Sequence, residues 1–357
     1  MTLKSTLALF RPEIRELTPY SSARTEAAGV AGEYWFDANE LPYTPYPADE
    51  ETSGMNRYPE PQPIELRKIL SDIASVNEEQ VLLTRGADEA IDLIVRGFCA
   101  EGKSAIIQCS PTFGMYALSA KVQGADVIDV PLSKDKFDLD VEAILNAWNP
   151  SVKVVFLCSP NNPTSNLMDM GKIERLCNEL DGKAIVVVDE LYTAFSTAPS
   201  MTTKIAEYSN LIILQSISKA YGMAGLRIGM AIARPEIVRI LSGMLPPYPL
   251  ALPSIKIAEK ALSPEGRKYL NEKIAIILQE RERLADALQK SPEVEKVFSS
   301  DSNFLLVKVK DAVQLTKTLA DQGIVIRNRN GQLHLENCVR ISVGTPEENN
   351  KLIEALA

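Results

Sequence analysis

The chain has 357 residues, of which 45% are hydrophobic and 24% are charged. This composition is typical of a soluble globular protein that is long enough for two domains with ample cores. A formal net charge of −9 argues against a nucleic-acid partner, and no apolar run is long enough to span a bilayer.

Scarce residue types narrow the chemistry further. Five cysteines are scattered without a Cys-x-x-Cys pair and the first residues lack a signal sequence, so we expect reduced thiols in a cytoplasmic protein. His334 is the only histidine, which excludes multi-histidine metal sites and allows a Ser-His-Asp triad only with His334 as its base. No metal site is predicted. Proton transfer must depend mainly on Lys, Tyr, Asp or Glu, which favours a lysine-centred mechanism.

The N-terminal stretch to about residue 52 is rich in Pro, Tyr and polar residues and predicts an arm with little regular structure. Apolar runs then alternate with amphipathic segments. Strands are expected at 81–83, 104–109, 153–158, 184–188 and in the run that leads to Lys219, and helices at 64–74, 86–98 and 170–180. The strands are continuously apolar, as strands covered on both faces are. We therefore predict an α/β fold with a mostly parallel central sheet flanked by helices.

A second region begins near Leu245. A charged amphipathic helix at about 269–289 and strands at 304–309 and 339–343 predict a smaller α+β C-terminal domain. The expected division is an N-terminal arm at 1–52, a large domain at 53–245 and a small domain at 246–357.

Lys219 lies between an apolar strand and a glycine-rich turn, although lysine is normally a solvated surface residue. Ser216 and Ser218 precede it and Arg227 follows it. A Schiff base to an aldehyde cofactor would explain the lysine, with the hydroxyls and the guanidinium binding the phosphate of that cofactor. The alternative is an ordinary surface lysine at the start of a helix.

Other candidate side chains also follow strand ends, where open α/β sheets bind ligands. Asp189 is placed to keep a pyridine nitrogen protonated, unless it is only a turn or N-cap aspartate. Glu190 is a weaker candidate because it points the other way in an extended segment. Tyr192 and Asn162 are plausible donors to a cofactor ring oxygen, although asparagine before proline is also a common turn residue.

Two further features are individually weak. The turn at 86–88 precedes a helix and offers backbone N–H groups to a phosphate. Phe113 would stack on a cofactor ring, or else serve as a core aromatic residue.

Several segments together resemble the fold-type I aminotransferases, which depend on pyridoxal 5′-phosphate (PLP). Residues 218–229 are similar to the lysine segment of that family, 158–164 to its Asn-Pro loop and 188–192 to its Asp-x-x-Tyr segment. The similarity is closer still to the histidinol-phosphate aminotransferase subfamily and covers essentially the whole chain. The segments that carry this closer similarity are 17–20, 37–40, 56–59, 84–89, 111–116 and 340–345.

The resemblance implies site residues by matching position. The implied catalytic residues are Lys219, Asp189 and Tyr192. The implied cofactor-binding residues are Ala87, Asp88, Phe113, Asn162, Asp189, Tyr192, Ser216, Ser218, Lys219, Arg227 and Tyr58, of which Tyr58 would reach the site of the other subunit. The implied substrate-binding residues are Tyr20, Asn39, Arg327 and Arg340. A homodimer with shared active sites follows, in which the N-terminal arm makes dimer and active-site contacts.

Three positions depart from the family pattern. Ser165 replaces the usual glycine after the Asn-Pro-Thr turn, Phe113 stands where many relatives have tyrosine, and Ser216 stands where threonine is common. None of these changes removes a required chemical group.

The activity implied by the resemblance is transfer of the amino group of L-histidinol phosphate to 2-oxoglutarate in L-histidine biosynthesis, giving imidazole acetol phosphate and L-glutamate. One site would accept a phosphate and a carboxylate in turn by bidentate pairing with Arg327 and Arg340, helped by Tyr20. Either arginine is alternatively an ordinary surface cation. Alternatives to this activity are an aromatic amino-acid transaminase, a phospho-amino-acid decarboxylase and, from another class, a non-catalytic PLP-binding regulator.

Overall fold

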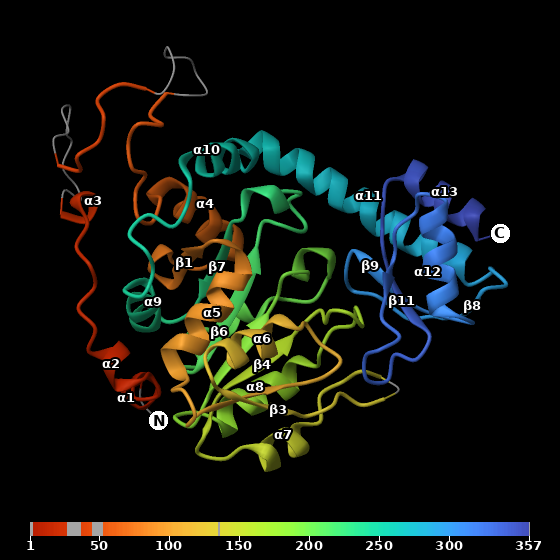
Figure 1. The fold of residues 1–357 in the computed structure, drawn as a ribbon, viewed down its shortest axis with the longest axis horizontal. Helices are drawn as coiled ribbons and strands as arrows, with labels where there is room; N and C mark the ends of the chain where they lie inside the picture. Colours follow the sequence, from red (N-terminus) through yellow and green to blue (C-terminus); the bar gives the residue numbers. More distant parts are fainter. Residues whose placement is uncertain (1–2, 27–36, 45–52, 135, 357) are drawn as a thin grey trace.

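The computed structural model describes residues 3–26, 37–44, 53–134 and 136–356, and within them two sheets (Figure 1). The larger sheet has the strand order β1-β7-β6-β5-β4-β2-β3. Its strands are β1 (Val81–Thr84), β2 (Ala105–Gln108), β3 (Asp126–Asp129), β4 (Val152–Cys158), β5 (Ile185–Asp189), β6 (Leu211–Ser216) and β7 (Gly229–Ile232). Strands β3, β2, β4, β5 and β6 pair in parallel, whereas β7 is antiparallel to both β6 and β1. The predicted mostly parallel sheet is confirmed.

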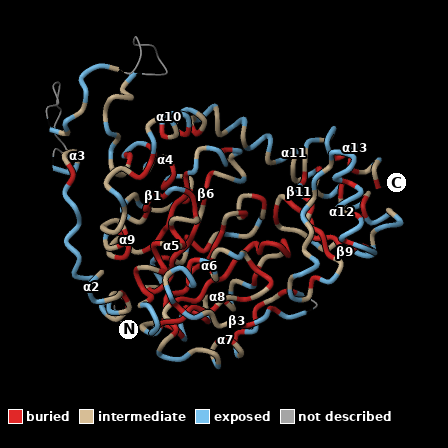
Figure 2. The backbone as a smooth tube through the Cα atoms, viewed as in Figure 1, coloured by how far each residue is buried: buried red, intermediate tan, exposed pale blue. Residues whose placement is uncertain are grey.

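Helices cover both faces of this sheet. They are α4 (Ile64–Ala74), α5 (Gly86–Phe98), α6 (Met115–Val122), α7 (Val141–Ala147), α8 (Met170–Glu179), α9 (Pro235–Ser242) and α10 (Leu252–Ala261). Successive strand residues belong to two separate cores: Ile212 packs into one and Ile213 into the other. Because side chains alternate between the faces of a strand, burial on both faces explains the continuous apolar runs. Figure 2 shows these buried strands at the centre of the large domain.

The smaller sheet is antiparallel with the order β10-β11-β9-β8. Its strands are β8 (Val294–Val297), β9 (Phe304–Val309), β10 (Arg327–Asn328) and β11 (Cys338–Ser342). Helices α12 (Ala312–Asp321) and α13 (Pro346–Ala355) share a core with it. The predicted smaller α+β region is confirmed.

Helix α11 (Pro264–Leu288) connects the two parts and runs from α10 towards α13 (Figure 1). It begins earlier than the predicted 269, because the Ser263 side chain accepts a hydrogen bond from the Gly266 N–H at 3.2 Å and caps the helix. Helix α10 contributes Ile255 and Ala258 to the same core as α4. The domain division at 245/246 therefore remains a proposal.

The described part of the predicted arm contains three short helices, α1 (Leu3–Leu7), α2 (Pro12–Arg15) and α3 (Ala23–Glu26). Residues 27–36 and 45–52 of that arm lie outside the described residues. Four 3₁₀ turns complete the described elements: η1 (Glu78–Gln80), η2 (Thr193–Phe195), η3 (Met201–Lys204) and η4 (Ala224–Leu226). Within the described ranges, no helix is both long and apolar enough to cross a membrane.

Candidate active site

A cavity of about 550 Å³ lies at the carboxyl ends of β4, β5 and β6 and is closed on one side by residues of β10 and β11. The sequence predicts the candidate catalytic and cofactor-binding side chains at this edge of the sheet. The predicted site residues that line the cavity are Ala87, Asp88, Phe113, Asn162, Asp189, Tyr192, Ser216, Ser218, Lys219, Arg227, Arg327 and Arg340. Chain positions up to 253 residues apart are thus gathered around one space.

Asp189 is the last residue of β5 and its carboxylate is buried. Its Oδ2 accepts a hydrogen bond of 2.5 Å from the Tyr116 hydroxyl, and its Oδ1 accepts one of 3.2 Å from the Leu191 N–H. Burial raises the pKa of Asp189 to about 6, although these two hydrogen bonds favour the ionised form. Among the described residues no cation forms an ion pair with it. A carboxylate held in this way is suited to a cationic group of a ligand.

Glu190, the adjacent carboxylate, is engaged in hydrogen bonds outside the cavity. It accepts hydrogen bonds from the Ser200 hydroxyl, the Met201 N–H and the Gln215 amide, and it is not among the residues that line the cavity. The choice of Asp189 over Glu190 agrees with this geometry.

Lys219 lies three residues after the end of β6, and its side chain lines the cavity. Its Nζ lies 5.9 Å from the centre of the Tyr192 ring. Burial lowers the pKa of Lys219, and the charges of Arg340 and Arg227 lower it further. Within the described part of the chain, no residue forms a hydrogen bond or an ion pair with this amine. An amine of lowered pKa is suited to act as a nucleophile and as a proton carrier.

Asn162, Tyr192 and Arg340 form a chain of contacts that also lines the cavity. The Asn162 amide nitrogen donates to the Tyr192 hydroxyl at 3.3 Å, and the Arg340 guanidinium donates to the Asn162 amide oxygen. Phe304 supports both ends, because its ring lies 5.1 Å from the Tyr192 ring and 5.2 Å from the Arg340 guanidinium. Arg340 is thus held at the site rather than free at the surface.

A cup suited to an anion (the anion cup) lies at the start of α5 and includes Ala87, Asp88, Ser216, Ser218 and Arg227. The N-cap residue Arg85 provides no side-chain cap, so the first N–H groups of α5, which begins at Gly86, remain for another acceptor. The Ser216 hydroxyl donates to the Ile228 carbonyl at 3.0 Å and accepts from the Ser218 N–H at 3.1 Å. Both serines line the same cavity as Ala87 and Asp88 of this helix end.

Two glycines make the cup possible. Gly86 has a φ of +76°, and a Cβ on it would come within 2.7 Å of the Arg227 guanidinium. A Cβ on Gly229 would lie 2.6 Å from the Ala87 nitrogen, so β7 approaches α5 more closely than any side chain allows. The Arg227 guanidinium lies 3.3 Å from the Asp88 carboxylate, and both groups are about half exposed.

Tyr20, Asn39 and Tyr58 do not line this cavity within one chain. Tyr20 is 75% exposed and lies in a separate surface groove beside Pro19. Asn39 is exposed, and Tyr58 stacks on Tyr248 with ring centres 4.4 Å apart. Their predicted roles stay predictions.

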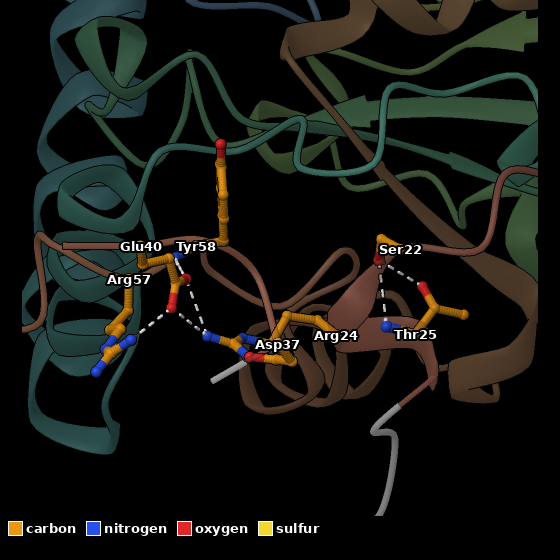
Figure 3. A network of polar contacts seen from close by, with 7 residues as sticks. All are labelled: Ser22, Arg24, Thr25, Asp37, Glu40, Arg57 and Tyr58. Carbon is orange, nitrogen blue, oxygen red and sulfur yellow. Dashed lines mark hydrogen bonds and ion pairs between the residues drawn. The ribbon is translucent and has the colours of Figure 1, made fainter. Parts of the chain in front are cut away.

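The backbone around Tyr58 is anchored by a buried carboxylate (Figure 3). Glu40 accepts the Tyr58 N–H at 2.7 Å and pairs with Arg24 at 2.9 Å and Arg57 at 2.7 Å. Burial opposes ionisation, yet the hydrogen bonds from Tyr58 and Arg57 and the charge of Arg24 lower the pKa of Glu40. Figure 3 shows the Tyr58 ring pointing away from this network.

Sequence reasoning missed three residues that contribute to the site. Tyr116 lies inside the 111–116 motif and was not assigned a role. Arg329 and Gln332 also line the cavity, and the signal for Arg329 was its spacing of two residues from Arg327.

Ser165 has a φ of +65°, which explains why glycine is usual at that position.

A free amine, a buried carboxylate and an anion cup, gathered at the carboxyl edge of a mixed sheet, define an aminotransferase-type site. The family model described as aminotransferase class I and II matches residues 31–356, and the chain belongs to that family. The histidinol-phosphate aminotransferase of Shigella flexneri serotype 5b is 44% identical over 349 residues, which span 98% of this chain and 96% of that relative.

Solved structures share the fold. The histidinol-phosphate aminotransferase from Clostridium acetobutylicum has a TM-score of 0.78 at 25% identity, covering 86% of this chain and 92% of that chain. The enzyme of the same name from Sinorhizobium meliloti, solved in complex with pyridoxal-5′-phosphate, has a TM-score of 0.75 at 22% identity, covering 89% and 88%.

Proposed function

We propose that this protein transfers the amino group between L-histidinol phosphate and 2-oxoglutarate, giving imidazole acetol phosphate and L-glutamate in L-histidine biosynthesis. The observation that carries the proposal is that Lys219, Asp189 and the two arginines Arg327 and Arg340 line one cavity. The 44% identity to a histidinol-phosphate aminotransferase over nearly the full chain supports the same activity.

The cavity suits PLP as cofactor. Asp189 is a buried carboxylate without a cationic partner among the described residues, which fits a protonated ring nitrogen. The uncapped start of α5, with Ser216, Ser218 and Arg227, fits a phosphate dianion. When bound, PLP supplies an aldehyde that condenses with amines and a ring that withdraws electrons from the reacting carbon.

Each side chain in the cavity would then have its own role in holding the cofactor or moving a proton. The Lys219 Nζ would hold the cofactor aldehyde until an amino donor arrives, and as a free amine it would accept the proton from the substrate carbon. Tyr192 and Asn162 would donate hydrogen bonds to the ring oxygen of the cofactor, and Phe113 would stack on its ring. Asp189 would keep the ring nitrogen of the cofactor protonated, and Tyr116 orients Asp189 through its hydroxyl.

Arg327 and Arg340 would bind the anionic groups of the two substrates in turn by bidentate pairing. Tyr20 and Asn39 are further proposed substrate contacts. A homodimer in which Tyr58 reaches the cofactor phosphate of the other subunit is part of the proposal, because the Tyr58 side chain does not line the cavity of its own chain.

A panel of amino donors with 2-oxoglutarate tests the assignment. The PLP-loaded enzyme should show a higher kcat/KM for L-histidinol phosphate than for phenylalanine or tyrosine. A preference for the aromatic amino acids would instead identify an aromatic transaminase. Binding of PLP without any turnover of amino donors would favour a regulator.

A further inference from the structure

Three arginines share one face of the small sheet. Arg327 of β10 is the cross-strand partner of Arg340 of β11, and the Arg329 N–H continues the pairing by donating to the Cys338 carbonyl at 2.9 Å. Because side chains alternate along an extended segment, Arg329 lies on the same face as Arg327. All three side chains line the cavity.

This grouping is electrostatically unfavourable without a ligand. Like charges directly opposite on paired strands repel, and in the part of the chain that the structure describes none of the three arginines has a carboxylate partner. The Arg329 Nε is buried without a hydrogen-bond partner, as is the Oε1 of the neighbouring Gln332. Burial, followed by the charges of Arg340 and Arg327, lowers the pKa of Arg329 to about 10, so the group is still a cation at neutral pH.

The number of guanidiniums exceeds what a carboxylate needs. One guanidinium satisfies a carboxylate by bidentate pairing. A phosphate monoester carries a charge of about −1.5 to −2 at neutral pH and three acceptor oxygens, so it can engage several guanidiniums at once. Arg340 already donates to the Asn162 amide oxygen, so a phosphate that pairs with Arg327 and Arg340 still has acceptor capacity for Arg329.

We propose that Arg329 is a specificity-determining residue that binds the phosphate of the amino donor and makes the site prefer phosphorylated donors to unphosphorylated ones. This inference rests on the proposed function and assigns the third arginine to it. Gln332 lies beside Arg329 on the same wall of the cavity.

The test uses Arg329→Gln and Arg329→Lys in the PLP-loaded dimer, with L-histidinol phosphate and unphosphorylated L-histidinol as donors. Arg329→Gln should lower kcat/KM for the phosphorylated donor about 10- to 100-fold, mainly through KM, and leave L-histidinol within about 3-fold. Arg329→Lys should recover part of the loss, because it keeps the charge but not the planar fork. Arg175→Gln, which removes a surface cation paired with Glu142 at 2.6 Å, is the charge-matched control and should behave as wild type.

Inorganic phosphate gives a readout that does not depend on the donor. Its inhibition constant in the PLP-loaded enzyme should rise at least about 10-fold in Arg329→Gln and stay unchanged in Arg175→Gln. Equal losses for both donors, or an unchanged inhibition constant, would overturn the inference. A wild-type enzyme that does not prefer L-histidinol phosphate would count against the proposed function instead, and the phosphate measurement would still decide the role of Arg329.

Discussion

The Tyr116 hydroxyl donates a 2.5 Å hydrogen bond to the Asp189 carboxylate, and both groups are buried. The Tyr116 ring is itself held by stacking on Phe156, with ring centres 4.7 Å apart. This arrangement aims one carboxylate at the cavity without giving it a positive partner within the described chain. Asp189 is therefore costly to ionise until a cationic ligand arrives.

Replacing Asp189 should separate stability from activity. The pKa of Asp189 is about 6 in the folded protein and about 3.8 when unfolded. A raised pKa destabilises the folded state once the pH exceeds the unfolded value, and the penalty is complete above the folded value. Without cofactor, Asp189→Asn should exceed wild type in free energy of unfolding by up to about 3 kcal/mol at pH 8. This advantage should shrink as the pH falls from about 6 to 4 and vanish near pH 4.

Denaturant unfolding of the cofactor-free proteins across that pH range measures the difference. The same variant loaded with PLP should lose orders of magnitude in kcat, because the ring nitrogen of the cofactor loses the carboxylate that keeps it protonated. A near-normal rate would mean that another group protonates the ring, and a pH-independent stability difference would contradict the burial argument.

Lys219→Ala should abolish turnover and remove the absorbance band of the lysine–cofactor Schiff base, because no other amine lines the cavity in the described chain. Visible absorbance after PLP addition and a transamination assay check both effects. Lys317→Ala is a suitable control, since Lys317 is exposed on α12 and pairs with Asp321 at 2.9 Å. Normal turnover by Lys219→Ala would refute the assignment of this lysine.

Mixed dimers test whether Tyr58 serves the other subunit. A dimer of one Tyr58→Phe chain and one Lys219→Ala chain would contain one intact composite site and one doubly altered site. Its activity should be about half that of the wild-type dimer and should exceed that of Tyr58→Phe homodimers at low PLP. If each site were built within one chain, the mixed dimer would retain only a single Tyr58→Phe site and would fall below the homodimer.

Gly229→Ala should disturb the anion cup. The added Cβ would meet the backbone of Gly86 and Ala87 at 2.6 Å, and backbone cannot move aside as a flexible side chain can. We expect a loss of about 1–3 kcal/mol in the free energy of unfolding and weaker PLP binding. Gly225→Ala is the matched control, because a Cβ there has no neighbour within 4 Å. Thermal unfolding and a PLP titration of both variants decide the matter, and equal behaviour would contradict the close approach of β7 to α5.

Much of this protein follows from local sequence. Continuous apolar runs predict β4, β5 and β6 because strands covered on both faces need apolar side chains at every position, and polar residues at their ends predict the cavity that contains Lys219, Asp189 and Asn162. By contrast, β7 was not predicted, since it has only four residues and begins with a glycine. Strand β3 was missed because its end residues Asp126 and Asp129 are exposed.

Tertiary structure alone decided which side chains meet. Tyr116 and Asp189 are 73 positions apart, and their hydrogen bond depends on how α6 packs over the sheet. Arg329 becomes part of the site only because the pairing of β10 with β11 turns it to the face of Arg327 and Arg340. The local sequence pattern determines the helices and strands and the strand ends at which the candidate site residues lie. The orientation of the site side chains and the balance of charge around them depend on long-range packing, which no single segment contains.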